Sequence, residues 1–237
     1  MHDLSRARSI GELNERSLHR ALKARYATVG AAAEQAIDGF VVDLVIGGRI
    51  VEIHTSGFSR LKTKLPRLLK RHRVTLVHPI PRDKYIVKVA TDRDGRGTVR
   101  LRRSRRKSPK HGTVFDVFSA LVSIPALLAH PDFTLEIVMT VEDELRTVAE
   151  GRAWRRRGWI RLERQLVDVV ATHRIASMAD LFAMVDADLP EQFTAGDLAT
   201  AMKSPRRLGQ QAAFCFRKAG VSEICGKRGN ALVYRRA

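Results

Sequence analysis

Two short runs of mainly apolar residues, 40–46 and 50–55, are separated by a glycine pair, Gly47 and Gly48. Runs of this length rich in Val and Ile predict strands, and two glycines between two such runs predict a hairpin with a two-residue turn. Counting outward from the turn places Asp43 opposite Glu52, with about 5 Å between their Cβ atoms. The pattern therefore predicts a hairpin that brings two carboxylates together.

The same periodicity predicts the elements around this hairpin. Apolar residues recur at helical spacing in residues 13–26 and 59–72. Residues 34–37 form a short strand pattern, and the continuous apolar run 73–80 is typical of a buried strand. The predicted order is helix, three strands, helix, strand, which indicates an α/β domain with an αβββαβ core and a mixed sheet.

A second domain is expected after a change of composition at residues 146–160. The chain passes from acidic to basic over residues 142–157, and 146–160 is interpreted as a basic linker between a first domain, 1–145, and a second domain, 161–237. The first domain is expected to gain a helix at 114–129 and a strand at 133–140. The second is expected to contain helices at 161–173, 178–185, 195–202 and 205–219, with caps at Thr194 and Ser204, and a hairpin of 222–225 with 231–235.

Charge narrows the class of partner. The chain has 237 residues, and its 43 Lys and Arg against 25 Asp and Glu give a net charge of +18, which favours a polyanion. An anionic membrane is the competing partner, but there is no apolar run long enough to span a bilayer and no signal-peptide pattern. We therefore expect a cytoplasmic protein, nucleoid-associated if prokaryotic, with no membrane partner. Cys215 and Cys225 lack metal-site spacing and are expected to be reduced thiols.

The facing carboxylates carry the candidate chemistry. Both faces of the hairpin look too apolar for a solvated sheet surface, so Asp43 and Glu52 should repel one another there. A bound divalent cation would turn this repulsion into attraction, and Mg²⁺ or Mn²⁺ is the expected cofactor. The alternative is that both acids lie on a wet face, with Arg49 as a surface counter-charge.

This order of elements, with Asp43 on the second strand and Glu52-Ile53-His54 on the third, resembles the restriction-endonuclease-like superfamily, the PD-(D/E)XK nucleases, over residues 13–80. The resemblance implies that Asp43 and Glu52 bind Mg²⁺ and that Glu15 on the first helix is an accessory ligand. For Glu15 the alternative is a first-turn acid favoured by the helix dipole.

His54 stands where the family has a lysine. A histidine is mostly neutral near pH 7, but it could act as a general base toward the attacking water. Lys62, in the next helix, could supply the missing positive charge from a different position. The alternative for Lys62 is an ordinary solvated lysine.

The second domain resembles the winged helix-turn-helix family over residues 161–236. The resemblance implies a helix in the major groove and a wing on the backbone. The residues expected to contact DNA are Arg206, Arg207, Gln210 and Gln211 on the helix and Lys227 and Arg228 on the wing. Protein contacts or dimerisation are the alternative use of such a fold.

A basic stretch in the first domain, with Arg102, Arg103, Arg105 and Arg106, is interpreted as a phosphate-contacting arm, or else as a solvated loop.

Together these patterns predict a metal-dependent DNA endonuclease that hydrolyses phosphodiester bonds and is positioned on duplex DNA by a winged helix. The alternative is a catalytically inactive, nuclease-like DNA-binding regulator. An RNA-processing nuclease is a third hypothesis, because phosphate contacts do not distinguish the sugar. A homodimer is the expected arrangement if both strands are cut.

Overall fold

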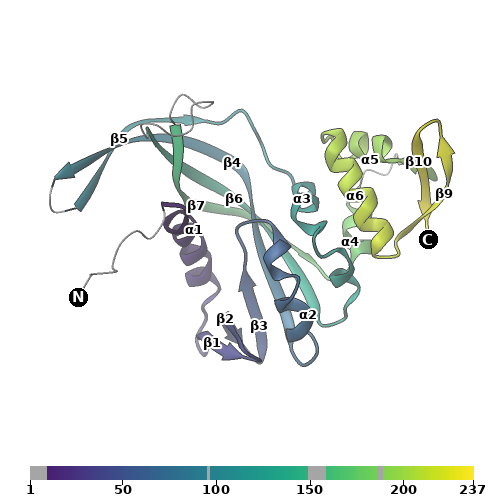
Figure 1. The fold of residues 1–237 in the computed structure, drawn as a ribbon, viewed down its shortest axis with the longest axis horizontal. Helices are drawn as coiled ribbons and strands as arrows, with labels where there is room; N and C mark the ends of the chain where they lie inside the picture. Colours follow the sequence, from purple (N-terminus) through teal and green to yellow (C-terminus); the bar gives the residue numbers. More distant parts are fainter. Residues whose placement is uncertain (1–9, 95–96, 149–158, 186–188) are drawn as a thin grey trace, which may run out of the picture. The chain divides into compact units, whose positions relative to one another are not determined.

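The structure is a computed structural model that describes residues 10–94, 97–148, 159–185 and 189–237, with side chains described except at 10–16, 90–94 and 97–103. Its elements follow the chain as shown in Figure 1. In order they are α1 (Ile10–Tyr26), β1 (Ala32–Ile37), β2 (Phe40–Ile46), β3 (Arg49–Ile53), η1 (Phe58–Leu61), α2 (Lys64–Leu68), β4 (Arg73–Asp94), β5 (Gly97–Lys107), η2 (Val114–Val117), α3 (Phe118–Leu121), η3 (Pro125–Ala129), β6 (Phe133–Val148), β7 (Trp159–Ile175), α4 (Met178–Ala183), β8 (Gln192–Thr194), α5 (Ala195–Ala201), α6 (Arg206–Lys218), β9 (Ser222–Arg228) and β10 (Ala231–Arg236). None of the helices in the described residues is long and apolar enough to cross a membrane.

A large mixed sheet organises the chain. Its strand order is β1-β2-β3-β4-β6-β7, and β5 pairs with β4 beside this path. Strands β1, β2 and β3 are successively antiparallel, whereas β3 and β4 are parallel because α2 connects them. The order α1, β1, β2, β3, α2, β4 and the α/β class are those predicted from the sequence.

The described chain forms two compact units, each built from three segments. Unit 1 comprises residues 1–26, 81–112 and 139–171, and unit 2 comprises 27–80, 113–138 and 172–237. Strands β4, β6 and β7 contribute to both units. This division is not contiguous in sequence, so it differs from the one expected from composition, in which a linker at 146–160 follows residue 145.

Two predicted helices are shorter or broken in the structure. The helix expected at 59–72 is replaced by η1 and the short α2, and the one expected at 114–129 is divided into η2, α3 and η3. Pro125 at the start of η3 lacks the N–H that would continue a helix from α3. The apolar residues still face the core, because Leu65 and Leu68 in α2 are fully buried.

The helix predicted at 161–173 is wrong, because β7 occupies Trp159–Ile175. The apolar residues of this segment fit one face of a helix as well as a strand. Which of the two forms is decided by packing against strands that are distant in sequence. In unit 1, Leu162 packs against a cluster of Val87, Val89 and Leu145 from β4 and β6. Non-local packing of this kind commonly overrides a local pattern.

The C-terminal part of unit 2 has the predicted helices and hairpin. Thr194 caps α5, since its hydroxyl accepts from the backbone N–H of Asp197 at 3.2 Å while the Asp197 carboxylate accepts from the N–H of Thr194 at 2.7 Å. The predicted Ser204 cap is wrong, because its hydroxyl donates to Met202 O and Pro205 occupies the N-cap of α6. Strands β8, β10 and β9 form a small antiparallel sheet in that order.

Aromatic side chains connect this C-terminal part to the rest of unit 2. The centre of the Phe216 ring on α6 lies 5.2 Å from the centre of the Phe118 ring on α3 and 4.8 Å from that of the Phe182 ring on α4. Both pairs pack edge to face. Phe182 in turn packs against Phe193 of β8. Phe118 and Phe216 are fully buried, so α6 is anchored by its apolar face.

Candidate active site

The β2–β3 hairpin has the predicted turn and register. Gly47 and Gly48 adopt positive φ angles of 54° and 74°, as a two-residue turn of this hand requires. The paired residues are Ile46 with Arg49, Val45 with Ile50 and Leu44 with Val51. Continuing the same register by one residue sets Asp43 opposite Glu52.

The two carboxylates have different surroundings. Asp43 is half-buried, and its Oδ2 accepts a hydrogen bond of 2.8 Å from the backbone N–H of Ile53 on β3. Glu52 is buried, with a residue exposure of only 5%. A buried glutamate does not belong to a wet sheet face, so this alternative for Glu52 is wrong.

A lysine that the sequence interpretation passed over completes the site. Lys64, the first residue of α2, places its Nζ 2.7 Å from Oε1 of Glu52, and the same ammonium donates to Val41 O at 2.6 Å. Lys62, the lysine considered from the sequence, is exposed. The helical period did not distinguish the two lysines, because Lys62 lies three residues before buried Leu65 and Lys64 lies four before buried Leu68.

Burial sets the protonation behaviour of Glu52. Removal from water raises the pKa of its carboxyl above the ordinary value, and the neighbouring Asp43 charge acts in the same direction. The ammonium of Lys64 opposes the shift without cancelling it. A cation beside Glu52 would therefore stabilise a charge that the fold alone leaves partly uncompensated.

His54 is used by the loop that follows β3. Its Nε2 lies 3.1 Å from Gly57 O and 3.2 Å from Ser56 Oγ, and its own carbonyl accepts from Nδ1 of His78 at 2.6 Å. When Nε2 carries a proton it donates to Gly57 O, and when it does not it accepts from the Ser56 hydroxyl. In either form the ring contacts the loop before η1 and holds this loop in place.

The remaining predicted ligand, Glu15, lies in α1, and its side chain is outside the described part of the chain. Among the side chains that are described, no group of three or more His, Cys, Asp and Glu residues is arranged to hold a metal. Asp43 and Glu52 are the carboxylates that could hold a cation at this hairpin. Two carboxylates fit Mg²⁺, which commonly keeps several waters and takes its other ligands from substrate phosphates.

The predicted arm residues do not behave alike. The Arg105 guanidinium contacts Asp143 at 2.8 Å and lies 3.4 Å from the centre of the Tyr85 ring, so unit 1 already holds it in place. The bond to Asp143 raises the pKa of Arg105 further. Arg106 is exposed, whereas the side chains of Arg102 and Arg103 lie outside the described residues.

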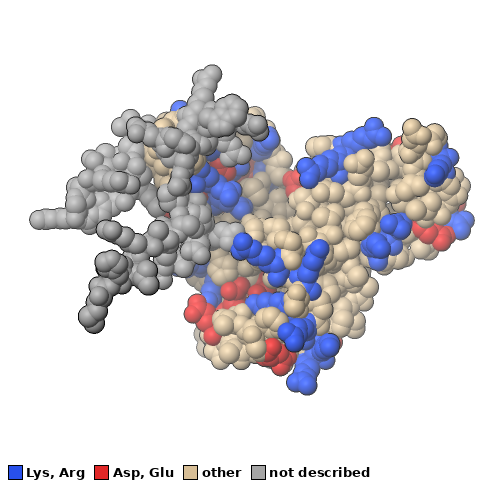
Figure 2. Space-filling view, viewed as in Figure 1, with Lys and Arg blue, Asp and Glu red and all other residues tan. Residues whose placement is uncertain are grey.

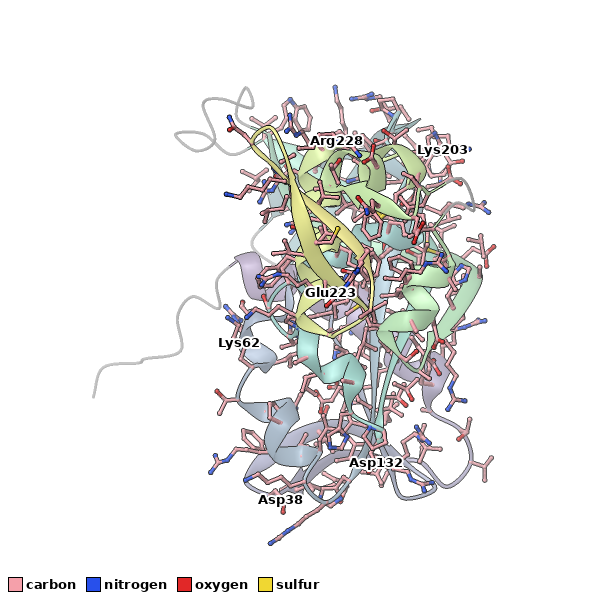
Figure 3. All side chains as sticks on the ribbon, turned by 90° about the vertical axis from the view of Figure 1, so that its right-hand side faces the viewer. Asp38, Lys62, Asp132, Lys203, Glu223 and Arg228 are labelled. Carbon is pink, nitrogen blue, oxygen red and sulfur yellow. The ribbon has the colours of Figure 1, made fainter. Side chains whose placement is uncertain are left out.

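The predicted contacts of the C-terminal part lie mainly on its surface. Arg206, Arg207 and Gln210 are exposed on α6, and Gln211 is half-buried. The remaining two, Lys227 and Arg228, are exposed at the end of β9 beside the hairpin turn (Figure 3).

Mg²⁺ is expected to stabilise the protein more at high pH than at low pH. The pKa of Glu52 is higher in the folded protein than in the unfolded chain, so protonation of Glu52 stabilises the fold. This contribution to stability is complete below the pKa of the unfolded state and is lost as the pH rises through the pKa of the folded state. Mg²⁺ binds the ionised carboxylate and should recover that loss. Thermal melts with Mg²⁺ and with EDTA, at about pH 5 and about pH 8, measure the effect.

Glu52→Gln is the control for this melt, because it removes the titrating group while keeping the side-chain shape. It should abolish the extra Mg²⁺ stabilisation at the higher pH. A Mg²⁺ effect of equal size at both pH values, or one that persists in this variant, would contradict a role of Glu52 as ligand.

Comparison with known proteins identifies the family of the chain. Residues 16–176, more than half of the chain, match the family described as a domain of unknown function, DUF8091. The chain belongs to the DUF8091 family. An uncharacterized protein of Treponema pallidum (strain Nichols) is 31% identical to this DUF8091 protein over 230 residues, which cover 96% of the chain and 88% of the relative. No solved structure matches the chain.

Proposed function

We propose that this DUF8091 protein is a Mg²⁺- or Mn²⁺-dependent endonuclease that hydrolyses phosphodiester bonds in double-stranded DNA. The observation that carries the proposal is the surroundings of Glu52: Lys64 of α2 lies 2.7 Å from it, and Asp43 faces it across the hairpin and helps to raise its pKa. Two carboxylates and one ammonium are a suitable set for holding a divalent cation beside a phosphate.

The topology around these residues supports the proposal. A helix, three antiparallel strands, a helix and a parallel strand is the order on which the resemblance to PD-(D/E)XK nucleases rests. In this proposal Lys64 supplies the positive charge that the lysine of the family provides, and it reaches Glu52 from α2, which follows η1. The lysine role is therefore proposed for Lys64 and not for Lys62.

Each residue has a defined part in this proposal. Asp43 and Glu52 would hold the cation, which supplies a polarised phosphate and a more acidic bound water. Lys64 offers a fixed ammonium toward the developing negative charge, and Val41 O limits its motion. His54 keeps the loop after β3 in place.

The C-terminal part supports duplex DNA as the substrate. The order α4, β8, α5, α6, β9, β10 with its three-stranded sheet is compatible with the proposed resemblance to a winged helix. The exposed residues of α6 include Arg206, Arg207 and Gln210, whose side chains suit base-edge and phosphate contacts. In this role α6 enters the major groove and the β9–β10 hairpin contacts the backbone.

A second candidate function is DNA binding without catalysis, as in a regulator. It is favoured by the fact that protein donors already contact both carboxylates, Ile53 N–H at Asp43 and Lys64 at Glu52. In that case the Lys64–Glu52 ion pair would be a structural link between α2 and β3.

The test is cleavage of supercoiled DNA, linear duplex DNA and RNA by the purified full chain with Mg²⁺, Mn²⁺ or EDTA, with DNA affinity measured in EDTA. The Asp43→Ala protein, prepared in parallel, reports any contaminating nuclease. Cleavage that requires the metal and disappears in the variant supports the nuclease. Tight DNA binding with no cleavage under any of these metals would overturn it in favour of the regulator, and cleavage restricted to RNA would overturn the choice of DNA.

A further inference from the structure

The segment between the third strand and the second half of β4 is strongly and uniformly basic. From Ile53 to Arg82 it contains no Asp or Glu. Its cationic residues are Arg60, Lys62, Lys64, Arg67, Lys70, Arg71, Arg73 and Arg82. Like charges at this density repel one another unless they are paired or neutralised by an anion from outside.

Some of these cations have partners within the protein. Lys64 contacts Glu52, Arg73 lies 3.5 Å from Asp132, and the Arg67 guanidinium lies 5.7 Å from the centre of the Phe40 ring. Arg71 makes a long, exposed contact of 3.9 Å with Asp38. These four side chains are engaged, at least in part, in holding α2 and the neighbouring strands.

Three others form what we call the basic ridge: Arg60, Lys62 and Lys70. All three are exposed, and none has an acidic partner among the side chains that the structure describes. Figure 2 shows Lys and Arg side chains gathered on the surface over α2, and Lys62 is labelled in Figure 3. Lys62 precedes Lys64 by only two residues, and all three residues of the ridge belong to unit 2, as the candidate active site does.

We infer that the basic ridge binds the phosphate backbone of the DNA duplex beside the candidate active site. The inference rests on the proposed function and adds a contact surface that neither the arm of unit 1 nor α6 provides. Ammonium and guanidinium groups without an acidic partner contribute most to the free energy of binding a polyanion, because their binding releases the counterions condensed on the polyanion. Next to Lys64, they would hold a strand close to Asp43 and Glu52.

The packing of α2 favours DNA over an anionic membrane. A helix that binds a membrane surface needs an exposed apolar face to insert below the headgroups. The apolar residues of this segment, Leu61, Leu65, Leu68 and Leu69, are all buried in the core, with exposures of 5% or less. The basic ridge therefore presents positive charge but no apolar surface that could insert into a membrane, as expected of a surface that contacts a phosphate backbone.

The experiment measures binding of a short fluorescent duplex to the full chain in EDTA, so that cleavage does not contribute. The test variant carries Arg60→Gln, Lys62→Gln and Lys70→Gln. The control carries Arg20→Gln, Arg25→Gln and Arg174→Gln, which remove the same charge from exposed positions elsewhere. The slope of log K against log salt is expected to fall by about 3 in the ridge variant, with at least a tenfold loss of affinity, and to stay near wild type in the control.

The outcomes separate this inference from the proposed function. A ridge variant that binds like the control overturns the ridge, while cleavage by the wild-type chain would still support the nuclease. Equal losses in both variants would mean that only net charge matters, and this also overturns the ridge. Stronger binding of the wild-type chain to phosphatidylserine vesicles than to DNA, lost in the ridge variant, would overturn DNA as the ligand of this surface.

Discussion

Lys64→Gln is expected to lower the rate of DNA cleavage at saturating substrate by about 10²- to 10³-fold, and Asp43→Ala by at least as much. Removal of a single positioned electrostatic group from an active site commonly costs this much. Lys64 is well placed for such a role because Glu52 and Val41 O hold its ammonium at distances of 2.7 and 2.6 Å. Glutamine keeps a hydrogen-bond donor but has no charge and is too short to replace it.

The measurement is single-turnover cleavage of a linear duplex, accompanied by DNA affinity in EDTA and circular dichroism. Arg25→Gln removes an exposed charge from α1 and serves as the matched control. A loss of rate with unchanged affinity and unchanged spectrum assigns Lys64 to the chemistry. If Lys64→Gln only lowers the melting temperature and leaves the rate of the folded protein intact, the ion pair is structural and the assignment is wrong.

Gly209→Ala is expected to destabilise unit 2 by about 2–3 kcal/mol, although helix propensity alone predicts a gain of about 1 kcal/mol. Gly209 lies in α6 where this helix packs against α5. A Cβ at this position would lie 2.2 Å from Ala195 O and 2.8 Å from the Ala199 Cβ. A backbone oxygen cannot rotate away as a side chain can, so α5 and α6 would have to separate.

Gly196→Ala, on the exposed side of α5, is the matched control. Its Cβ would meet only the Thr194 hydroxyl, at 3.3 Å, so a change within about 0.5 kcal/mol is expected. Urea unfolding followed by circular dichroism compares the two variants. A Gly209→Ala protein as stable as Gly196→Ala would mean that α5 and α6 do not pack as closely as described.

Local patterns in the chain were sufficient for the β2–β3 hairpin and for the two acids of the candidate site. The apolar runs 40–46 and 50–55 and the paired glycines determine a hairpin whose register follows by counting, so the position of Asp43 relative to Glu52 could be predicted. Capping of α5 by Thr194 and the termination of α6 just before Gly220, which has a φ of 75°, are also local, since they depend on neighbouring backbone groups. The α/β class followed from the order of these elements.

Non-local contacts decided the rest. Residues 161–173 carry a pattern compatible with a helix, and only pairing with β6 and packing on Val87 and Val89 make them a strand. Lys62 and Lys64 are nearly equivalent in sequence, yet only the docking of α2 against β3 brings Lys64 to Glu52 and leaves Lys62 at the surface. The sequence by itself determined the β2–β3 hairpin, its turn and the position of Asp43 opposite Glu52, because these depend on short-range geometry. The tertiary structure alone decided which cation reaches them, because a charge is placed by the packing of the whole element that carries it.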